Sequence, residues 1–309
     1  MAILVTGAAG LVGRAAVAAL LRQGVEHVRA VVRDPAQVGD LRRLGAKVAL
    51  LDATDPDGLA AAMDGVFTAC SLTGSLWSRP PEGPPAAVVD PAQVFLAAAK
   101  AAGVRRVVVC SPAAVGTPAA ANAHLAATAE VEHMVAASGL EYAILRCAHV
   151  LGPGARLLGL LTAGAAGPGH PSGAPGREPV LVPGDGHQRV APVWVGDVAD
   201  AIATADNAAE LGGTTWSLAG PTQLTFDELV DAAHGDRVAK RHLGAGGPGG
   251  PAPGLWAGLS EVQIGVLAAD SLGDPALPAP PGLVPASLAE TLARSAGRER
   301  AGLPGRLDG

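Results

Sequence analysis

The feature that most constrains the fold of this chain is a glycine-spaced turn directly behind its first apolar segment. The run Ala2–Val5 contains no turn residue, which predicts a buried parallel strand, and Gly7, Gly10 and Gly13 follow at regular intervals. Apolar residues at helical spacing come next. This order of strand, glycine turn and helix predicts a site for the pyrophosphate of a dinucleotide; a plain turn between strand and helix is the alternative.

The spacing assigns a separate role to each glycine. Gly7 permits the tight turn, Gly10 lets the backbone approach a pyrophosphate, and Gly13 lets the helix pack closely on the strand. The backbone N–H groups of Leu11 and Val12 then lie at the positive end of the helix. We therefore predict that these five residues bind the phosphates of a dinucleotide cofactor.

The next strand ends indicate which dinucleotide is bound. The predicted strand His27–Arg33 ends on a cation, and the planar guanidinium of Arg33 suits a 2′-phosphate, whereas an NAD site would carry an acidic residue there. The sequence therefore favours NADPH (NADP) over NADH, and a solvated charge at the strand end is the alternative. Asp52 closes the third strand and is expected near the adenine edge. Leu72 and Thr73 follow the fourth strand, where ligands of such sheets bind.

Strands and helices alternate through the first half of the chain, which predicts a parallel sheet with helices on both faces. We expect an α/β fold, a Rossmann-type doubly wound parallel sheet. Residues 1–150 would form the dinucleotide-binding domain, 151–296 a smaller substrate-binding part interleaved with it, and 297–309 a flexible tail. The six strands are predicted over Ala2–Val5, His27–Arg33, Lys47–Leu51, Val66–Cys70, Arg105–Cys110 and Glu141–Arg146.

Beyond Val150 the pattern is less regular. Short strands are predicted at Val180–Pro183 and Arg189–Trp194, and Thr214–Leu218 reads as extended without an assigned partner. Thr225 is followed three residues later by Glu228, a capping-box spacing that predicts the start of a helix.

Charge and hydropathy exclude several classes of function. The 309 residues carry 28 Asp and Glu against 22 Lys and Arg with no basic cluster, which argues against nucleic acid as a partner. No apolar stretch is long enough for a membrane span, and we expect no signal peptide before the first strand. Cys70, Cys110 and Cys147 read as small buried residues in a reduced compartment. We expect a cytoplasmic protein without a metal site, and the sequence leaves a homodimer open.

Several segments together resemble the atypical short-chain dehydrogenases/reductases, most closely the NmrA-like NAD(P)-binding group. That group includes NADPH-dependent quinone and aromatic-ring reductases as well as cofactor-sensing regulators, so the resemblance implies the fold and cofactor more strongly than one activity. It covers about residues 1–235. Besides the glycine turn it rests on Val32–Pro35, Ser138–Arg146, Gly184–Gly186, Asp197–Ala199 and Leu218–Pro221.

The proton relay of catalytic short-chain dehydrogenases is absent. In that family a Tyr-x-x-x-Lys pair holds the nicotinamide ribose and passes a proton to the carbonyl oxygen. Here His124 and Thr128 stand at the matching positions, and the single tyrosine, Tyr142, falls in a predicted strand. Either His124 replaces the tyrosine as general acid, or reduction occurs only where the substrate needs no proton from the protein. A capping or exposed helix histidine is the alternative.

The resemblance also implies further site residues. Ser111 matches the family's strand-five serine, and His149 follows the sixth strand, where family members line the nicotinamide side of the pocket. With His124 these form the predicted catalytic set, although Ser111 could instead cap the following turn. The expected substrate pocket combines Trp77, His149 and Trp194 with the insert Leu151–Val182 and would take an apolar or aromatic small molecule. Trp77 could equally be a partly buried anchor.

Three functions follow from these residues. The first is an NADPH-dependent reductase of a quinone-like or conjugated aromatic small molecule that transfers hydride without the Tyr/Lys relay. The second is a non-catalytic NAD(P)-sensing regulatory protein. The third is a non-redox cyclase, dehydratase or isomerase that uses His124 or His149 as acid/base.

Overall fold

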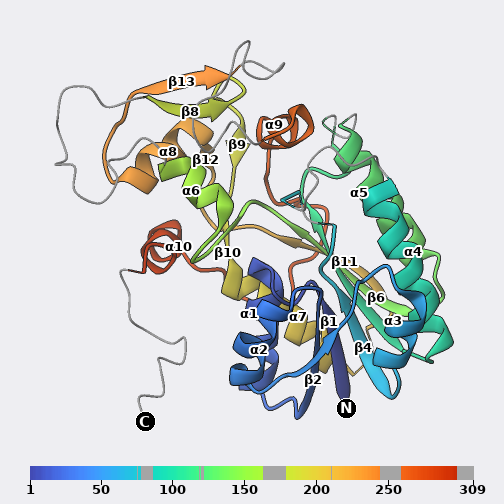
Figure 1. Cartoon of the computed structure of the whole chain (residues 1–309). Coiled ribbons are helices and arrows are strands. Elements are labelled where there is room, and N and C mark those ends of the chain that lie inside the picture. The colour runs from blue at the N-terminus through green and yellow to red at the C-terminus, as the bar shows by residue number, and fades with distance from the viewer. Residues whose placement is uncertain are drawn as a thin grey trace, which may run out of the picture.

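A computed structural model describes residues 1–74, 76–77, 86–117, 119, 122–162, 179–209, 211–243 and 259–297. Within them, seven parallel strands form one sheet in the order β11-β6-β5-β4-β1-β2-β3, with helices on both faces (Figure 1). The predicted doubly wound α/β fold is confirmed. The strands are β1 (Ala2–Thr6), β2 (His27–Val32), β3 (Lys47–Leu50), β4 (Val66–Ser71), β5 (Arg106–Pro112), β6 (Glu141–Cys147) and β11 (Gly213–Leu218).

The strand order places a crevice beside the glycine turn. From β1 the chain builds outward through β2 and β3 on one side and, from β4 onward, on the other side. The loops that follow β1 and β4 therefore diverge, and ligands of such sheets bind at this switch point, beyond the carboxyl ends of the strands. Thr6 and Ser71 are paired neighbours at that edge.

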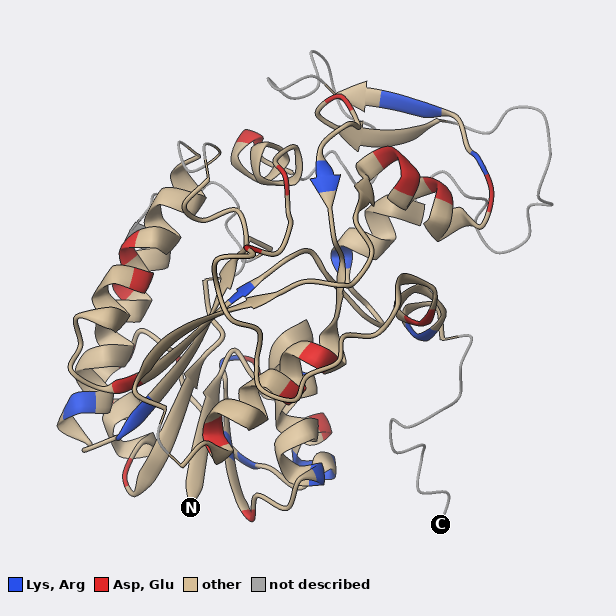
Figure 2. Ribbon diagram, turned by 180° about the vertical axis from the view of Figure 1, so that it is seen from behind, with Lys and Arg blue, Asp and Glu red and all other residues tan. Residues whose placement is uncertain are grey.

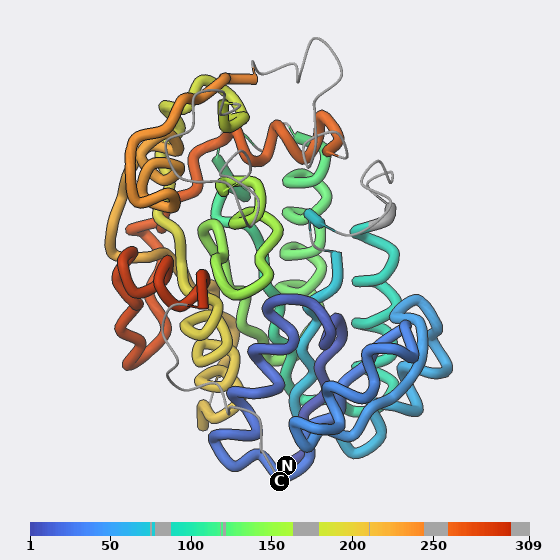
Figure 3. Tube along the Cα trace, turned by 60° about the vertical axis from the view of Figure 1, so that its left-hand side comes forward, coloured from blue at the N-terminus to red at the C-terminus, as the bar shows by residue number. Residues whose placement is uncertain are grey.

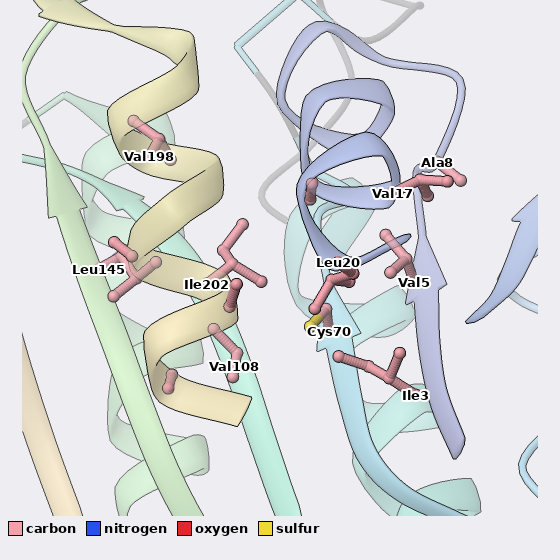
Figure 4. Close-up of a cluster of buried hydrophobic side chains, with 14 of the residues drawn as sticks. Ile3, Val5, Ala8, Val17, Leu20, Cys70, Val108, Leu145, Val198 and Ile202 are labelled. Atoms are coloured by element: carbon pink, nitrogen blue, oxygen red, sulfur yellow. The ribbon is translucent and has the colours of Figure 1, made fainter. Parts of the chain in front are cut away.

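Two apolar cores, one on each face, explain why the strands read as continuous apolar runs. Ile3 and Val5 of β1 point into one core and Leu4 into the other, because successive side chains of a strand alternate between faces. The first core is covered by α1 (Leu11–Arg22), α2 (Val38–Leu44) and α7 (Val195–Asn207), as Figure 4 shows for α1 and α7. The second is covered by α3 (Pro56–Ala62), α4 (Ala86–Ala101) and α5 (Ala123–Ala136).

Elements beyond residue 150 return to the sheet. The stretch expected only to be extended is β11, which pairs with β6, and α7 packs beside α1. Arg106, 1% exposed, anchors α7 because its guanidinium donates to the carbonyl oxygens of Ala205 and Asp206 at the end of that helix. Glu141 balances the charge of Arg106 at 2.8 Å, and this bond lowers the pKa of the Glu141 carboxyl. Segments after residue 150 therefore belong to the same sheet and core as those before it.

A smaller lobe lies above the carboxyl edge of the sheet (Figures 1 and 3). Among the described residues of this lobe, three short strand pairs and the helices around them form a third core. The pairs are β7 (Val150–Leu151) with β10 (Val193–Trp194), β8 (Val180–Pro183) with β13 (Lys240–Leu243), and β9 (Arg189–Val190) with β12 (Leu224–Thr225). The helices are α6 (Arg156–Thr162), α8 (Phe226–His234), α9 (Glu261–Leu267) and α10 (Leu288–Ser295).

One strand prediction in this lobe is wrong. Arg189–Trp194 is not a single strand but divides into β9 and β10, which pair with different partners. Pro192 lies between them and has no N–H with which to continue a ladder.

One predicted helix start is confirmed. Thr225 and Glu228 form the predicted capping box at the start of α8. The same pattern begins α9 at Ser260 and Gln263. These two helices therefore begin with the same local signal, but only the first was recognised in the sequence.

Two expectations fall partly outside the described residues. The predicted tail is described only at Gly297, and the predicted pocket insert only over 151–162 and 179–182. In the part of the chain that is described, no helix combines the length and apolar character that crossing a bilayer requires. Figure 2 shows acidic and basic residues on strands, helices and loops of both the sheet and the smaller lobe.

Candidate functional site

The glycine turn has the backbone geometry that the sequence predicted. Gly7 has φ +64°, and a Cβ there would lie 2.5 Å from the carbonyl oxygen of Leu72. At Gly13 a Cβ would lie 2.1 Å from the carbonyl oxygen of Gly7, so α1 can pack against the turn only with glycine at this position. At Gly10 a Cβ would approach only the Gly7 oxygen, at 3.2 Å, which leaves room above the turn.

The start of α1 is suited to an anion. The first bond within the helix runs from the Arg14 N–H to the Gly10 carbonyl at 2.9 Å. The N–H groups of Leu11, Val12 and Gly13 precede it, and such groups at a helix start need partners from outside the helix. Since the helix dipole is positive at this end, the turn fits the pyrophosphate of a dinucleotide.

A cavity of about 270 Å³ opens beside this turn. The loop after β4, the ends of β5 and β6, and residues of α4, α5, α6 and α9 also line it. Most of the predicted site residues are therefore brought together at one place. These are Gly7, Gly10, Leu11, Val12, Gly13, Leu72, Thr73, Trp77, Ser111, His124 and His149.

Three predicted site residues lie outside the lining of this cavity. Arg33 and Asp52 follow β2 and β3; the Arg33 side chain is 79% exposed and lies 3.8 Å from the Asp52 carboxylate. The hydroxyl and N–H of Thr54 donate to Asp52 and lower the pKa of its carboxyl. Trp194 lies directly before α7, where the Arg294 guanidinium from α10 covers its ring at 5.8 Å from the centroid.

Trp77 combines both roles considered for it. Its ring lines the cavity and also packs against the core of the smaller lobe. The Arg156 guanidinium at the start of α6 lies 5.4 Å from the ring centroid, within the range of a cation–π contact. Trp77 therefore links the loop after β4 to the smaller lobe.

Ser111 belongs to a buried network that the sequence did not predict. Its hydroxyl donates to Glu132 on α5, whose side chain also binds Arg146 on β6. The Arg146 guanidinium reaches both carboxylate oxygens, the shortest bond being 2.6 Å, and this bond raises the pKa of Arg146. Because Ser111 and Arg146 are paired across β5 and β6, the sheet register itself brings them to one carboxylate.

His124 lies at the start of α5, where its backbone N–H donates to the side-chain oxygen of Asn122 at 3.0 Å. Burial lowers the pKa of the His124 imidazole, which is therefore neutral near pH 7. Thr128, at the position that matches the family's lysine, donates its hydroxyl proton to the His124 carbonyl at 2.8 Å. The two residues therefore supply no counterpart of the charged lysine.

His149 is a second neutral imidazole. Burial lowers its pKa to about 4, and its ring lies edge-on to Phe226 with centroids 6.3 Å apart. Its Nε2 atom is buried and has no hydrogen-bond partner among the described residues. The backbone N–H is held by the Ser271 hydroxyl at 3.1 Å, which positions the residue at the cavity.

Helix α9 closes the cavity from a distant part of the chain and was not predicted as part of the site. Val266 and Leu267 line the cavity. Gln263, 1% exposed, donates to the Leu76 carbonyl at 2.7 Å, and Asn122 donates to the Val262 carbonyl at 2.9 Å. These bonds fasten α9 to the loop after β4 and to the start of α5.

The cysteines near the cavity carry no sign of reactivity. Cys110 and Cys147 line it, and Cys70 is fully buried. The Cys147 thiol donates to the Leu145 carbonyl at 3.4 Å, and burial raises the pKa of the Cys70 thiol. The buried thiols of Cys70 and Cys147 therefore stay protonated, in line with their interpretation as small buried residues, whereas Cys110 is only partly buried. The described residues contain no cluster of three side chains able to hold a metal ion.

Comparison with known families agrees with this geometry. A family profile described as NAD(P)H-binding matches residues 7–169, just over half of the chain. The chain belongs to this NAD(P)H-binding family. The match begins at Gly7, the first glycine of the turn, and confirms the resemblance to NAD(P)-binding proteins drawn from the sequence. No curated protein matches the chain by sequence.

Solved structures of the same fold span nearly the whole chain. An NADPH-dependent quinone oxidoreductase from Escherichia coli, complexed with NADPH, is 23% identical over 94% of this chain and 98% of its own, with a TM-score of 0.70. A triphenylmethane reductase from Citrobacter sp. is 18% identical over 96% and 100%, with a TM-score of 0.72. A UDP-glucuronic acid 4-epimerase from Bacillus cereus is 18% identical over 96% and 98%, with a TM-score of 0.67. At these identities the likeness shows a common fold.

Proposed function

We propose that this NAD(P)H-binding protein is an NADPH-dependent reductase of a quinone-like or conjugated aromatic small molecule. The observation that carries the proposal is a single cavity that runs from the glycine turn to the ends of β5 and β6 and ends among mainly apolar side chains and two neutral histidines, His124 and His149. When bound there, the reduced nicotinamide supplies a hydride. The residues around the cavity favour a substrate that accepts it without a proton from the protein.

The proposed cofactor contacts divide between backbone and side chain. The turn from Gly7 to Gly13 would hold the pyrophosphate, with Leu72 and Thr73 beside it. Arg33 would bind the 2′-phosphate, since its exposed guanidinium lies at the carboxyl end of β2 next to Asp52. This charge supports a preference for NADPH over NADH.

The proton balance supports a conjugated substrate. A simple ketone that accepts a hydride becomes an alkoxide and needs an acid beside its oxygen. The hydroxyl protons of Ser111 and Thr128 are already donated to Glu132 and to the His124 carbonyl. A conjugated acceptor spreads the added electron pair over its π system, and solvent can supply the proton later. The quinone oxidoreductase and the triphenylmethane reductase of similar fold are named for conjugated substrates, which also supports this class.

The proposal is tested by NADPH consumption with a panel of electron acceptors. We expect NADPH absorbance to fall with quinones or conjugated aromatic cations, with little or no loss with simple aliphatic ketones. The absence of NADPH oxidation with every conjugated acceptor would contradict the proposal.

A cofactor-sensing regulator is the second candidate. It is favoured because the hydroxyl protons of Ser111 and Thr128 are donated within the protein, so neither hydroxyl offers a proton to a substrate. It predicts that calorimetry finds unequal affinities for NADP⁺ and NADPH in a protein without turnover. The non-redox alternative is less well supported, because an imidazole such as His149 with a pKa of about 4 is a weak base near pH 7. It would be recognised by product formation without any change in NADPH absorbance.

A further inference from the structure

Ser111 lies between the cavity and a buried carboxylate. It lines the cavity with 4% of its surface exposed, and its hydroxyl donates to the Oε1 atom of Glu132. Glu132 is 7% exposed and is not among the described residues that line the cavity. A ligand at this place would therefore contact Ser111, and Glu132 would affect the ligand only through its hydrogen bond with Ser111.

Arg146 determines the direction of the Ser111–Glu132 bond. Its Nε atom lies 3.1 and 3.2 Å from the two carboxylate oxygens, and a terminal nitrogen lies 2.6 Å from Oε2. A carboxylate bound by a guanidinium offers only lone pairs, so the proton of the bond comes from Ser111. A hydroxyl has one proton, and the Ser111 oxygen therefore presents lone pairs to the cavity.

The neighbouring hydroxyls leave few free protons on this side of the cavity. Thr128 donates to the His124 carbonyl at 2.8 Å, and the hydroxyls of Ser71 and Thr73 share one bond at 3.3 Å. A ligand carbonyl opposite Ser111 would place lone pair against lone pair, which leaves both groups unsatisfied. A ligand O–H or N–H at the same place would be satisfied.

We infer that Ser111 binds a hydrogen-bond donor of the ligand and that Glu132 acts as a positioning residue that holds Ser111 in this acceptor state. The preferred ligands are conjugated compounds with a hydroxyl or amino group on the ring. The same compounds with an ether or a tertiary amine in its place are bound more weakly. The inference rests on the proposed function, because it names a substrate class for the same cavity, but ligand binding tests it without turnover.

The test compares two probes with the same ring system and the same attached oxygen, 1-naphthol and 1-methoxynaphthalene, which differ only in that a methyl group replaces the hydroxyl proton. Both are added to the full chain with saturating NADP⁺ in calorimetric titrations. We expect 1-naphthol to bind about tenfold more tightly, the typical effect of one well-made hydrogen bond. Equal affinity, tighter binding of the ether or binding of neither probe would overturn the inference.

Two variants connect this preference to the network. In Ser111→Ala the acceptor is lost, and the two probes should bind equally. In Glu132→Gln the amide oxygen turns to Arg146 and the amide N–H group to Ser111, which releases the serine proton toward the cavity. The preference for 1-naphthol should then disappear or reverse. If it persisted in both variants, Ser111 would not be the acceptor.

Glu141→Gln is the matched control. It also neutralises a carboxylate that binds a buried arginine, Arg106, but at the opposite end of β6 and outside the lining of the cavity. We expect this variant to lose stability and to keep the tenfold preference for 1-naphthol. If this variant lost the preference, the ratio of affinities would report general destabilisation, and the assignment to Ser111 would be overturned.

The activity assay separates the two proposals. A retained binding preference without NADPH oxidation contradicts the proposed function alone, and NADPH oxidation without a preference contradicts this inference alone.

Discussion

Two regions line the same cavity and are built in different ways. The glycine turn, Gly7–Gly13, presents backbone N–H groups from one continuous segment. The second region, here called the side-chain wall, lines the cavity with Ser111, His124, Thr128 and His149 from α5, β5 and the residues after β6. It also includes Glu132 and Arg146, which do not line the cavity but hold Ser111 through the hydrogen bonds of Glu132. A backbone site depends on local conformation, whereas the side-chain wall depends on tertiary packing. The turn should therefore be sensitive to any added atom, and the wall to loss of a hydrogen-bond or charge partner.

The largest expected effect comes from adding atoms to the turn. Gly13→Val would place a Cβ 2.1 Å from the Gly7 oxygen, so α1 must move away from the turn. We expect a loss of about 4 kcal/mol of unfolding free energy and no measurable cofactor binding, by chemical unfolding and calorimetry. Gly159→Ala in α6 is the control, because a Cβ there meets nothing within 4 Å. Normal NADPH binding by Gly13→Val would show that the turn is not the cofactor site.

The side-chain wall should respond to pH through His149. Its pKa is lowered to about 4 by burial, whereas an unfolded chain has a histidine pKa near 6.5. As pH falls from about 6.5 toward 4, the unfolded state binds a proton that the folded state does not. Stability is complete above this window and decreases within it, by roughly 3 kcal/mol in all.

Urea unfolding at several pH values measures this effect. His149→Gln should lose less stability between pH 6.5 and 4 than the unchanged chain, whereas a substitution of His133, which is exposed on α5, should keep the full decrease. Parallel pH curves for the unchanged chain and His149→Gln would count against a neutral buried His149.

Removal of a charge partner from the side-chain wall should have a smaller effect. Arg146→Ala leaves the Glu132 carboxylate, 9% exposed at its side chain, without its cation. We expect a loss of roughly 2 kcal/mol, since Arg146 itself is only partly buried. The exposed pair Arg14–Asp40 serves as comparison, and Arg14→Ala should cost less than about 1 kcal/mol. If thermal unfolding showed the same loss of stability for Arg146→Ala and Arg14→Ala, the expected difference between a buried and an exposed ion pair would be contradicted.

The smallest effect is expected at the edge of the cofactor site. Arg33→Ala should weaken NADPH binding about tenfold and leave NADH binding unchanged, because only NADPH carries the 2′-phosphate. Calorimetry with both cofactors measures the ratio of affinities. Arg22→Ala is a suitable control, because Arg22 lies at the end of α1 far from the glycine turn, where it pairs with Asp200 of α7. An equal loss for both cofactors would contradict a specific role for Arg33.

The sequence was most informative where local rules decide the structure. The tight turn at Gly7, the close packing of α1 at Gly13, the apolar strand runs and the capping box at Thr225 and Glu228 each depend on neighbouring residues. Each of these structural predictions was confirmed. It was least informative where distant segments meet. The partner of β11, the split of 189–194 between two ladders and the docking of α9 over the cavity all depend on contacts across more than thirty residues.

By itself, the sequence determined the doubly wound fold, the glycine turn behind the first strand and the absence of the Tyr/Lys relay, because strand burial and glycine geometry impose patterns on consecutive residues. Only the tertiary structure decided how the remaining polar groups are used. Glu132 is 21 residues from Ser111 in the chain, and Arg146 is 14 residues further on; no local pattern connects them. The register of β5 on β6 and the packing of α5 on the sheet bring them together, and through that contact the direction of the Ser111 hydroxyl is set.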